Sequence, residues 1–221
     1  RTELHDTTAR TGNGNGNGNG NDQPSLEVRV RGPNVTPGYW KAPELTAQAF
    51  DAEGFYLIGD AVTFADPARP ELGLFFDGRV AEDFKLSTGT WVHVGGLRIA
   101  TLAAAAPVLQ AAVVSGQDRD FVGMLAWPNA AGMKEICDDT ALHADPAVMM
   151  ASAAVREHVR QGLARHNAAN NGSSMRVARV LLMNEPPSID ANEITDKGYI
   201  NQRATLERRH ELVARLYADP P

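Results

Sequence analysis

The sequence predicts an α+β fold in two parts, a small β-rich module followed by a compact α+β domain. Short runs with strand character, separated by turn residues, fill residues 1–78. Beyond Arg79 the pattern changes, and apolar strands alternate with amphipathic helices. A chain of 221 residues with 43% hydrophobic and 22% charged residues has the composition of a globular protein and can bury a sizeable core.

The first module is expected to open with a hairpin. "TELHD" (2–6) and "SLEVRVRG" (25–32) have strand character, and in the second Leu26, Val28 and Val30 alternate with charged residues. This alternation predicts a strand that buries its apolar face. The intervening "TGNGNGNGNGND" (11–22) cannot bury apolar surface, so we expect a flexible linker or loop, or an over-long turn.

The remainder of the first module is predicted as a loop, a helix and strands. "GPNVTPGYW" (32–40) gathers prolines and glycines around an aromatic pair, which favours a shaped loop. "APELTAQAFD" (42–51) has helix character with Pro43 near its start. Short strands are expected between Phe55 and Phe76.

The second domain is expected to alternate strands with helices. We predict strands in "TWVHVGGLRIA" (90–100), "DFVGMLAWPN" (120–129) and "MRVARVLLMNEPPS" (175–188), and a helix or turn running into a strand over 106–117. The clearest helix spans 145–169, where apolar residues at helical spacing share one face: Val148, Ala151, Val155, Val159 and Leu163. A second amphipathic helix is expected over 202–218.

Charge and cysteine content exclude several classes of function. A formal net charge of −6 argues against a broad nucleic-acid-binding surface, which needs an excess of clustered Lys and Arg. The most apolar run, 101–114, is too short to span a bilayer, so no membrane partner is expected. A single cysteine, Cys137, suits a reducing compartment, and we expect a cytoplasmic protein. The six histidines show no metal-ligand spacing, so no metal site is predicted in this chain.

Three motifs in a fixed order carry the chemistry. They are "GFYLIGD" (54–60), "GRVAEDFKLSTGTWV" (78–92) and "NEITDKGYINQR" (192–203). Together they resemble the adenylate-forming acyl- and aryl-CoA ligases. The nearest likeness is to feruloyl-CoA synthase, and "GPNVTPGYW" is a further motif that resembles this enzyme. The resemblance runs from about Leu26 to the C-terminus.

The resemblance implies a two-step reaction and a division into domains. A carboxylate would attack ATP to give an acyl-adenylate and pyrophosphate, and the thiol of CoA would then displace AMP to give a thioester. Residues 1–78 would be the end of the large AMP-binding N-terminal domain, 79–82 the hinge, and 83–221 a mobile C-terminal lid. The substrate would be an aromatic or other carboxylic acid, as in phenylpropanoid degradation.

On the nucleotide side the resemblance assigns roles to Asp60 and Arg79. A carboxylate accepts two hydroxyl donors at once, so Asp60 would bind the ribose hydroxyls, whereas without the family it could simply cap a turn. Arg79 would contact the ribose and phosphate region, although a lone arginine there is most often a solvated one. The usual hinge acid or lysine is replaced by Ala81, which leaves open how rotation of the lid is biased.

On the lid the resemblance assigns roles to Lys85, Gly89 and Lys197. Lys85 and Gly89 belong to the segment that turns toward the site for thioester formation, where a glycine lets backbone approach a ligand closely. Lys197, between an acid and a glycine, matches the lysine that reaches the α-phosphate and the carboxylate during adenylation, where an ammonium offsets developing negative charge. Outside the family, Gly89 would be an ordinary turn glycine and Lys197 an exposed loop lysine.

The resemblance also implies parts that these residues do not contain. The phosphate-binding loop, the acid that binds Mg²⁺ and the acyl pocket are expected upstream, and the chain begins with Arg1, so we expect the front of a longer protein to be missing. An N-terminal domain would then be needed in cis or in trans. Two alternatives stay open: an adenylating domain that passes its acyl group to a carrier protein or reductase, and a non-catalytic truncated module.

Overall fold

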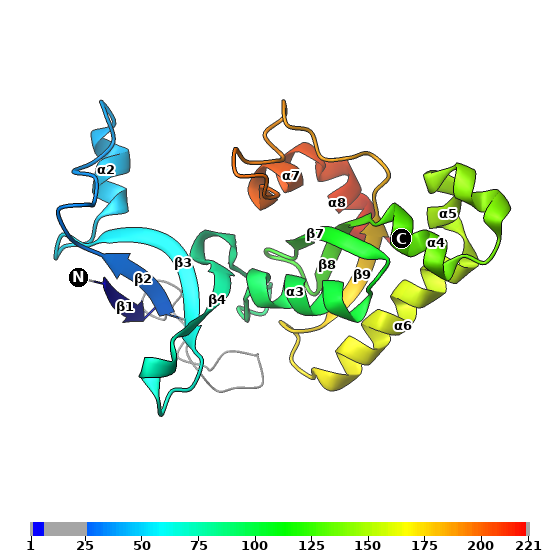
Figure 1. Cartoon of the computed structure of the whole chain (residues 1–221), viewed down its shortest axis with the longest axis horizontal. Coiled ribbons are helices and arrows are strands. Elements are labelled where there is room, and N and C mark those ends of the chain that lie inside the picture. The colour runs from blue at the N-terminus through cyan, green and yellow to red at the C-terminus, as the bar shows by residue number, and fades with distance from the viewer. Residues whose placement is uncertain (1, 7–25, 220–221) are drawn as a thin grey trace. The chain divides into compact units, whose positions relative to one another are not determined.

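The computed structural model describes residues 2–6 and 26–219, and the chain divides into two units, Arg1–Asp83 and Phe84–Pro221 (Figure 1). Both strands and helices are present in each, which confirms the predicted α+β class. The Gly-Asn tract at 11–22 lies outside the described residues. The boundary follows the predicted hinge, 79–82, within two residues; the hinge role itself stays a prediction.

The first unit is built on one antiparallel sheet. Its strands are β1 (Thr2–Asp6), β2 (Leu26–Val30), β3 (Tyr56–Phe64) and β4 (Leu74–Arg79), in the order β1-β2-β3-β4. Strands β1 and β2 pair in antiparallel register, so the predicted hairpin pairing is confirmed. Helix α2 (Pro43–Ala49) is confirmed as well, with its proline in the first turn, and none of its residues is buried. Short 3-10 turns cover Pro70–Leu72 (η1) and Val80–Glu82 (η2).

The buried face of β2 is the opposite of the predicted one. Glu27 is fully buried, whereas Leu26, Val28 and Val30 are only half-buried. The reason lies in Arg29, on the same face as Glu27, whose guanidinium lies 4.3 Å from the ring centroid of Phe55, a buried residue. The contacts of the charged face therefore determine which side chains of this strand are buried.

Arg29 is also the centre of an ion-pair cluster. Its Nη2 lies 2.7 Å from a carboxylate oxygen of Glu3, and its Nη1 lies 2.7 Å from Asp51 and 3.3 Å from Glu53. These partners, with the Asp51 hydrogen bond as the largest contribution, raise the pKa of Arg29. Strand β1, strand β2 and the loop before Phe55 are thus joined by one side chain.

The second unit contains a three-stranded sheet, β7-β8-β9, with helices on both faces. Strands β7 (Leu109–Ser115) and β8 (Val122–Pro128) are antiparallel, and β9 (Val177–Leu182) runs parallel to β8. A two-stranded hairpin of β5 (Phe84–Lys85) and β6 (Trp91–Val92) precedes them. The helices are α3 (Val94–Ala104), α4 (Ala130–Ile136), α5 (Pro146–Ala151), α6 (Ala153–Ala169), α7 (Gln202–Arg208) and α8 (His210–Tyr217), with a 3-10 turn, η3, at Thr140–Ala144.

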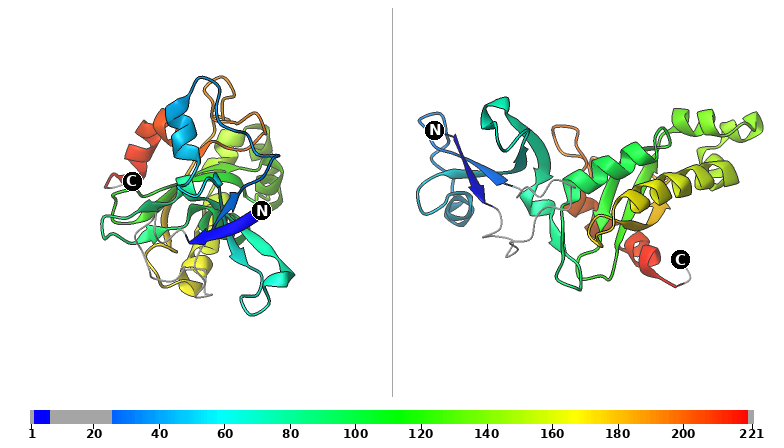
Figure 2. Two further views of the ribbon diagram at one scale, coloured as in Figure 1. Left: turned by 90° about the vertical axis from the view of Figure 1, so that its left-hand side faces the viewer. Right: turned by 90° about the horizontal axis from the view of Figure 1, so that it is seen from below.

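Alternate residues of the sheet enter two separate cores. Ala112, Val114 and Met124 face a cluster that includes residues of α3, α4, α5 and α6. Val113 and Leu125 face a second cluster covered by α7 and α8. Helices α3 and α6 lie side by side on their face of the sheet (Figure 2). The strands predicted within 120–129 and 175–188 are confirmed; β8 buries both of its faces, whereas in β9 only Val177 is fully buried.

The strand predicted over 90–100 is wrong beyond its first residues. Only Trp91–Val92 is extended, and Val94–Ala104 forms α3. The buried positions of this helix, Val94, Leu97 and Thr101, follow helical spacing, which packs them against β7 and α6. Over 106–117 the prediction of a turn running into a strand is confirmed by β7.

The helix predicted over 145–169 is two helices. Ser152 has extended backbone dihedrals, and its Oγ accepts a hydrogen bond from the backbone N–H of Val155, which caps the start of α6. Val155 and Val159 are buried as predicted, whereas Val148 is 46% exposed and Met149 takes the buried position instead. The helix predicted over 202–218 is likewise divided at Arg209 into α7 and α8.

Candidate functional site

Asp60 and Arg79 lie directly opposite each other on β3 and β4. Their Cα atoms are register partners, next to a bulge in the ladder between Asp60 and Val62. Arg79 Nη1 lies 2.9 Å from Asp60 Oδ1 and donates a hydrogen bond to the carbonyl oxygen of Ile58 at 3.2 Å. Oδ1 is buried and has no aligned hydrogen-bond donor among the described residues, while the Asp60 side chain as a whole is 31% exposed. The two nucleotide-side residues of the prediction are therefore neighbours.

Gly59 fixes the backbone immediately before this carboxylate. Its φ of +77° lies in the left-handed region, which L-residues other than glycine avoid. A β-carbon there would meet only Arg79 Nη1, at 4.0 Å, so conformation rather than crowding requires glycine. The Gly-Asp pair thus combines a backbone bend with an acid at the bulge.

Lys85 and Gly89 belong to one tight hairpin. Phe84 and Leu86 are buried and Lys85 between them is exposed, as strand alternation requires. The Gly89 backbone N–H donates to the carbonyl of Leu86 at 2.8 Å, with φ of +82° at the glycine. The ammonium of Lys85 lies 5.0 Å from the ring centroid of Trp91 across the hairpin. The hairpin therefore presents an exposed lysine and an open glycine.

Lys197 lies at the tip of a short turn. The backbone N–H of Gly198 donates to the Thr195 carbonyl at 2.9 Å, and the Thr195 N–H donates to the Tyr199 carbonyl at 2.8 Å. Ile194 and Ile200 form an antiparallel bridge below it. Lys197 is exposed and forms no hydrogen bond or ion pair with any residue that the structure describes. Its ammonium is thus available to an anionic ligand.

The base of this turn rests on a buried ion cluster that the sequence analysis missed. Glu193 is fully buried, and its Oε1 lies 2.6 Å from Arg209 Nε. Its Oε2 lies 2.6 Å from Arg208 Nη1 and accepts the Ser188 backbone N–H at 2.8 Å. Burial by itself would raise the pKa of Glu193, but Arg209, the Ser188 amide and Arg208 together lower it to about 2. The carboxylate is therefore ionised at neutral pH.

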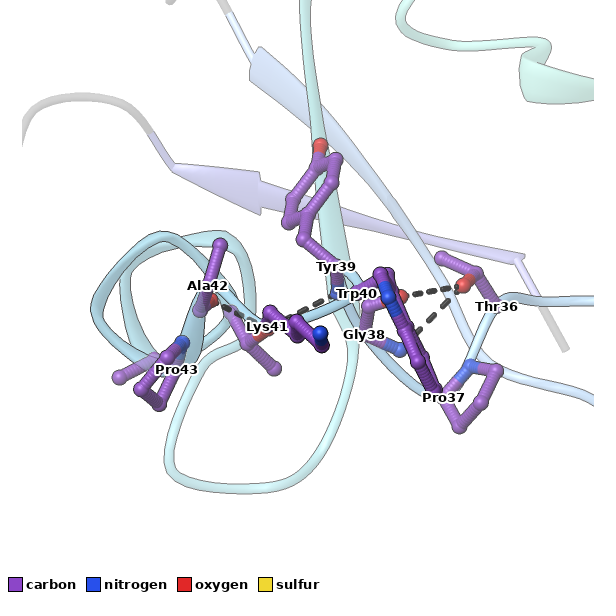
Figure 3. Close-up of a pocket in the computed structure, with 10 residues that line it drawn as sticks. Thr36, Pro37, Gly38, Tyr39, Trp40, Lys41, Ala42 and Pro43 are labelled. Carbon is purple, nitrogen blue, oxygen red and sulfur yellow. Dashed lines mark hydrogen bonds between the residues drawn. The ribbon is translucent and has the colours of Figure 1, made fainter.

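The loop 32–40 is ordered by its own polar groups and forms a shallow hollow, shown in Figure 3. Thr46 Oγ1 accepts the backbone N–H of Tyr39 at 2.9 Å and donates to the carbonyl of Ala42. The hollow has a volume of about 690 Å³ and is lined by residues 36–43 with Thr46 and Ala47. Trp40 beside it is 89% exposed. The predicted shaped loop is confirmed, but none of the predicted site residues lines the hollow.

The chain is similar to several proteins of known name, among them two ligases and a carboxylic acid reductase. Over 197 residues the chain is 27% identical to a chloroplastic long-chain-fatty-acid-[acyl-carrier-protein] ligase of Arabidopsis thaliana, covering 86% of this chain and 25% of that ligase. The A-PCP didomain of carboxylic acid reductase from Segniliparus rugosus, in complex with AMP, superimposes with a TM-score of 0.70 at 21% identity. It covers 99% of this chain and 28% of the didomain. The anthranilate CoA ligase AuaEII, in complex with anthranoyl-AMP, gives a TM-score of 0.57 at 17% identity, covering 97% of this chain and 34% of the ligase. No protein-family model matches the chain.

The chain has the fold of the C-terminal part of an adenylation domain. Two curated relatives match most of this chain, and the chain spans about a quarter of the length of each of them. These relatives are acyl-activating ligases, so the comparisons support the predicted superfamily of adenylate-forming acyl-CoA ligases. The narrower likeness to feruloyl-CoA synthase stays a prediction.

Neither a membrane-spanning helix nor a metal-binding cluster is present in the described part of the chain. Within residues 2–6 and 26–219, no helix combines the length and the apolar character needed to cross a bilayer. Over the same residues, no three His, Cys, Asp or Glu side chains gather closely enough to hold a metal ion.

Proposed function

We propose that this chain is the C-terminal part of an ATP-dependent carboxylic acid-CoA ligase of the aryl, feruloyl-CoA synthase-like kind. The complete enzyme would form an acyl-adenylate with release of pyrophosphate and then an acyl-CoA thioester with release of AMP. Residues 1–78 would end the AMP-binding domain, 79–82 would be the hinge, and 83–221 would be the lid.

The observation that carries the proposal is the state of Lys197. A lysine ammonium without a partner among the described residues, at the tip of a hydrogen-bonded turn, suits a ligand that brings its own negative charge. During adenylation, charge builds up on the oxygens of the α-phosphate as the carboxylate attacks, and a cation already in position stabilises that charge. Lys197 would supply it from the lid.

Asp60 and Arg79 would hold the nucleotide on the other unit. The Asp60 side chain is 31% exposed, so its carboxylate can accept hydrogen bonds from ribose hydroxyl donors. Arg79 uses Nη1 for Asp60 and Ile58, and its side chain is 50% exposed, so its remaining N–H groups can reach a phosphate. After adenylation the lid would rotate, and the hairpin with Lys85 and Gly89 would line the passage of the CoA thiol.

ATP, CoA and an aromatic or other carboxylic acid are the proposed substrates, and we propose a cytoplasmic enzyme. The acyl pocket and the ligands of Mg²⁺ would be supplied by an N-terminal domain, in cis or in trans. A role in phenylpropanoid degradation follows only if the acid is a phenylpropanoid.

A second acceptor has support from the relatives. One is named as an acyl-carrier-protein ligase, and the didomain structure of carboxylic acid reductase includes a carrier domain by its name. The alternative is therefore an adenylating domain that passes its acyl group to a carrier-bound thiol and not to CoA. Incubating the complete enzyme and ATP with either CoA or a phosphopantetheinylated carrier protein distinguishes the two, since each acceptor gives its own thioester product.

The decisive experiment measures the two half-reactions separately in the complete enzyme. We expect Lys197→Ala to slow pyrophosphate release by about 10²–10³-fold, the scale for losing one preorganised electrostatic contact. Thioester formation from preformed acyl-adenylate should be nearly unchanged. Lys85→Ala and Gly89→Trp should show the reverse pattern.

Gly89→Asn is the matched control for Gly89→Trp. Asparagine tolerates a positive φ, so it isolates backbone strain from the bulk that would block a narrow passage. A β-carbon at this position meets nothing within 4 Å, so the bulk would extend into open space.

Equal losses in both half-reactions for Lys197→Ala would show that the lysine supports folding or general binding, and the proposal would be wrong.

A further inference from the structure

The turn that carries Lys197 is closed by main-chain hydrogen bonds at two levels. Besides the contacts between Thr195 and Tyr199, the backbone N–H of Asn201 donates to the carbonyl of Glu193 at 2.8 Å. Residues 193 and 201 therefore form the base of a small hairpin, and any displacement of the base moves its tip. Glu193 begins this hairpin and Gln202 directly follows it, and both of these polar side chains are buried.

Glu193 attaches the first end of the hairpin to the junction of α7 and α8. Besides the three contacts given above, Arg209 Nη2 lies 3.0 Å from its Oε2. Arg209 is 5% exposed, donates to the carbonyl oxygens of Glu185 and Pro186, and lies over the ring of Trp127 at 5.2 Å. The carboxylate is thus bound to a guanidinium that is itself fixed to the core. Charge-assisted hydrogen bonds of this length are among the strongest polar contacts in proteins.

Gln202 attaches the second end to the sheet. It is 5% exposed, its Oε1 accepts the backbone N–H of Val114 at 3.0 Å, and its Nε2 donates to the carbonyl of Val114 at 3.2 Å. Strand β7 is an edge of the sheet, so this side-chain amide replaces a neighbouring strand at one residue. Arg98 of α3 donates to the same Oε1 at 3.2 Å. Both main-chain groups of Val114 form a hydrogen bond with this amide.

We propose that Glu193 and Gln202 are positioning residues that fix the hairpin of Lys197, an inference that rests on the proposed function. A lysine side chain is long and flexible, so it reaches a defined point only when its backbone is held. A displacement of about 1 Å in a catalytic group can cost about 10²-fold in rate. Two buried polar anchors, one at each end, limit such displacement while leaving the tip exposed.

The first test needs only the 221-residue chain and a protease that cuts after lysine. The chain has four lysines, at 41, 85, 134 and 197, so each cut gives fragments that mass spectrometry identifies. We expect Glu193→Gln and Gln202→Met, which keep side-chain length, to raise the rate of cutting after Lys197 by about tenfold, because the local opening that exposes a peptide bond becomes easier. Cutting at the other three lysines is the internal reference and should not change.

Two further variants keep this test decisive. Glu157→Gln removes an exposed carboxylate that is paired with Arg160 in the same unit, and it should change nothing. If Glu193→Gln also accelerates the cuts after Lys85 and Lys134, the second unit has unfolded. Arg208→Gln is then used instead, because its side chain is 37% exposed and it removes only one partner of Glu193. An unchanged rate after Lys197 in Gln202→Met and in the folded variant of the Glu193 cluster would overturn the proposal.

The second test is a double-mutant cycle on pyrophosphate release by the complete ligase. If Glu193 acts through Lys197, Glu193→Gln should slow release by about tenfold alone and have no further effect in Lys197→Ala. A merely structural residue would cost the same in both backgrounds, and that result would refute the positioning role. If Lys197→Ala has no effect at all, the proposed function fails, while the protease result still reports whether the anchors hold the hairpin.

Discussion

The two units of this protein differ in what holds each of them together. Among the residues that the structure describes, three buried hydrophobic side chains belong to the first unit and twenty-four to the second. The first unit instead exposes large apolar side chains, namely Tyr39, Trp40, Leu45, Leu72, Leu74, Phe75 and Phe76. Its strands are joined by main-chain pairing and by the Arg29 cluster. The second unit therefore has a core of its own, whereas the first depends on polar contacts.

Charge is divided in the same way. The first unit contains thirteen acidic and seven basic residues, and the second contains fourteen of each, so the net charge of −6 belongs to the first. Both units use ion clusters, a partly buried one around Arg29 and one around the fully buried Glu193. The Arg29 cluster stabilises a unit that has few buried apolar residues. The Glu193 cluster lies in a unit that also has an apolar core. Mutations of equal size should therefore have unequal effects in the two units.

The largest contrast is expected between Leu125→Ala and Phe76→Ala. Leu125 is fully buried in the second unit, and its truncation should lower the free energy of unfolding by about 2–5 kcal/mol through lost burial and a cavity. Phe76 is 59% exposed in the first unit, and its truncation should change stability by no more than about 0.5 kcal/mol. Urea unfolding followed by hydrogen exchange with mass spectrometry resolves the two units. Similar losses for both variants would remove the distinction between them.

A smaller effect is expected from acid. Because the pKa of Glu193 is lowered to about 2 in the folded state, the stabilisation from its ionised form is complete above the unfolded value of about 4.3. It should be lost as pH falls from there toward 2, since the folded state must then take up a proton against its arginine partners. Thermal unfolding of the wild type and of Glu193→Gln at a series of pH values tests this, and the variant should lack this part of the pH dependence.

Glu157 is the matched comparison for that experiment. Its hydrogen bonds from Arg160 and Gln161 lower its pKa to about 2 as well, but its side chain is 47% exposed. Solvent screening reduces such a pair to little net stabilisation. The pH dependence of Glu157→Gln should therefore match the wild type, and a loss equal to that of Glu193→Gln would show that burial does not matter here.

Most strands and helices were predictable because their burial follows from local periodicity. Strands β8 and β9 are apolar runs with turn residues at their ends, and α6 shows its buried face in Val155 and Val159. Helix α3 was not predictable in this way, because "TWVHVGG" has strand-forming residues and a glycine pair. Its helical form depends on packing against β7 and α6, which no short window of sequence contains.

The residues of the candidate site likewise divide into those that were predicted from the sequence and those that were missed. Lys197 and Gly89 were found because their motifs resemble those of a known family; the sequence by itself marks only a turn at each of them. Glu193, Arg209 and Gln202 were missed because charged and amide side chains are seldom buried. One signal was present: Arg209 stands four residues after Thr205 and seven before Leu216, on the buried stripe of the predicted helix. A charge on such a stripe needs a buried partner of opposite sign, and Glu193 is that partner.

The smallest contrast concerns two site glycines, Gly59 in the first unit and Gly198 in the second. Both have positive φ, +77° and +81°, and a β-carbon at either has no atom closer than 4.0 Å. Alanine should therefore cost about 1–2 kcal/mol at each through conformation alone. Gly172→Ala is the control, because that glycine has no positive φ and its nearest contact would be an ordinary 3.9 Å. Because strain of this kind is local, the two costs should be equal even though the units differ in their cores. A much larger loss for Gly59→Ala, measured by urea unfolding, would mean that the ladder between β3 and β4 transmits the strain through a unit with little apolar packing to absorb it.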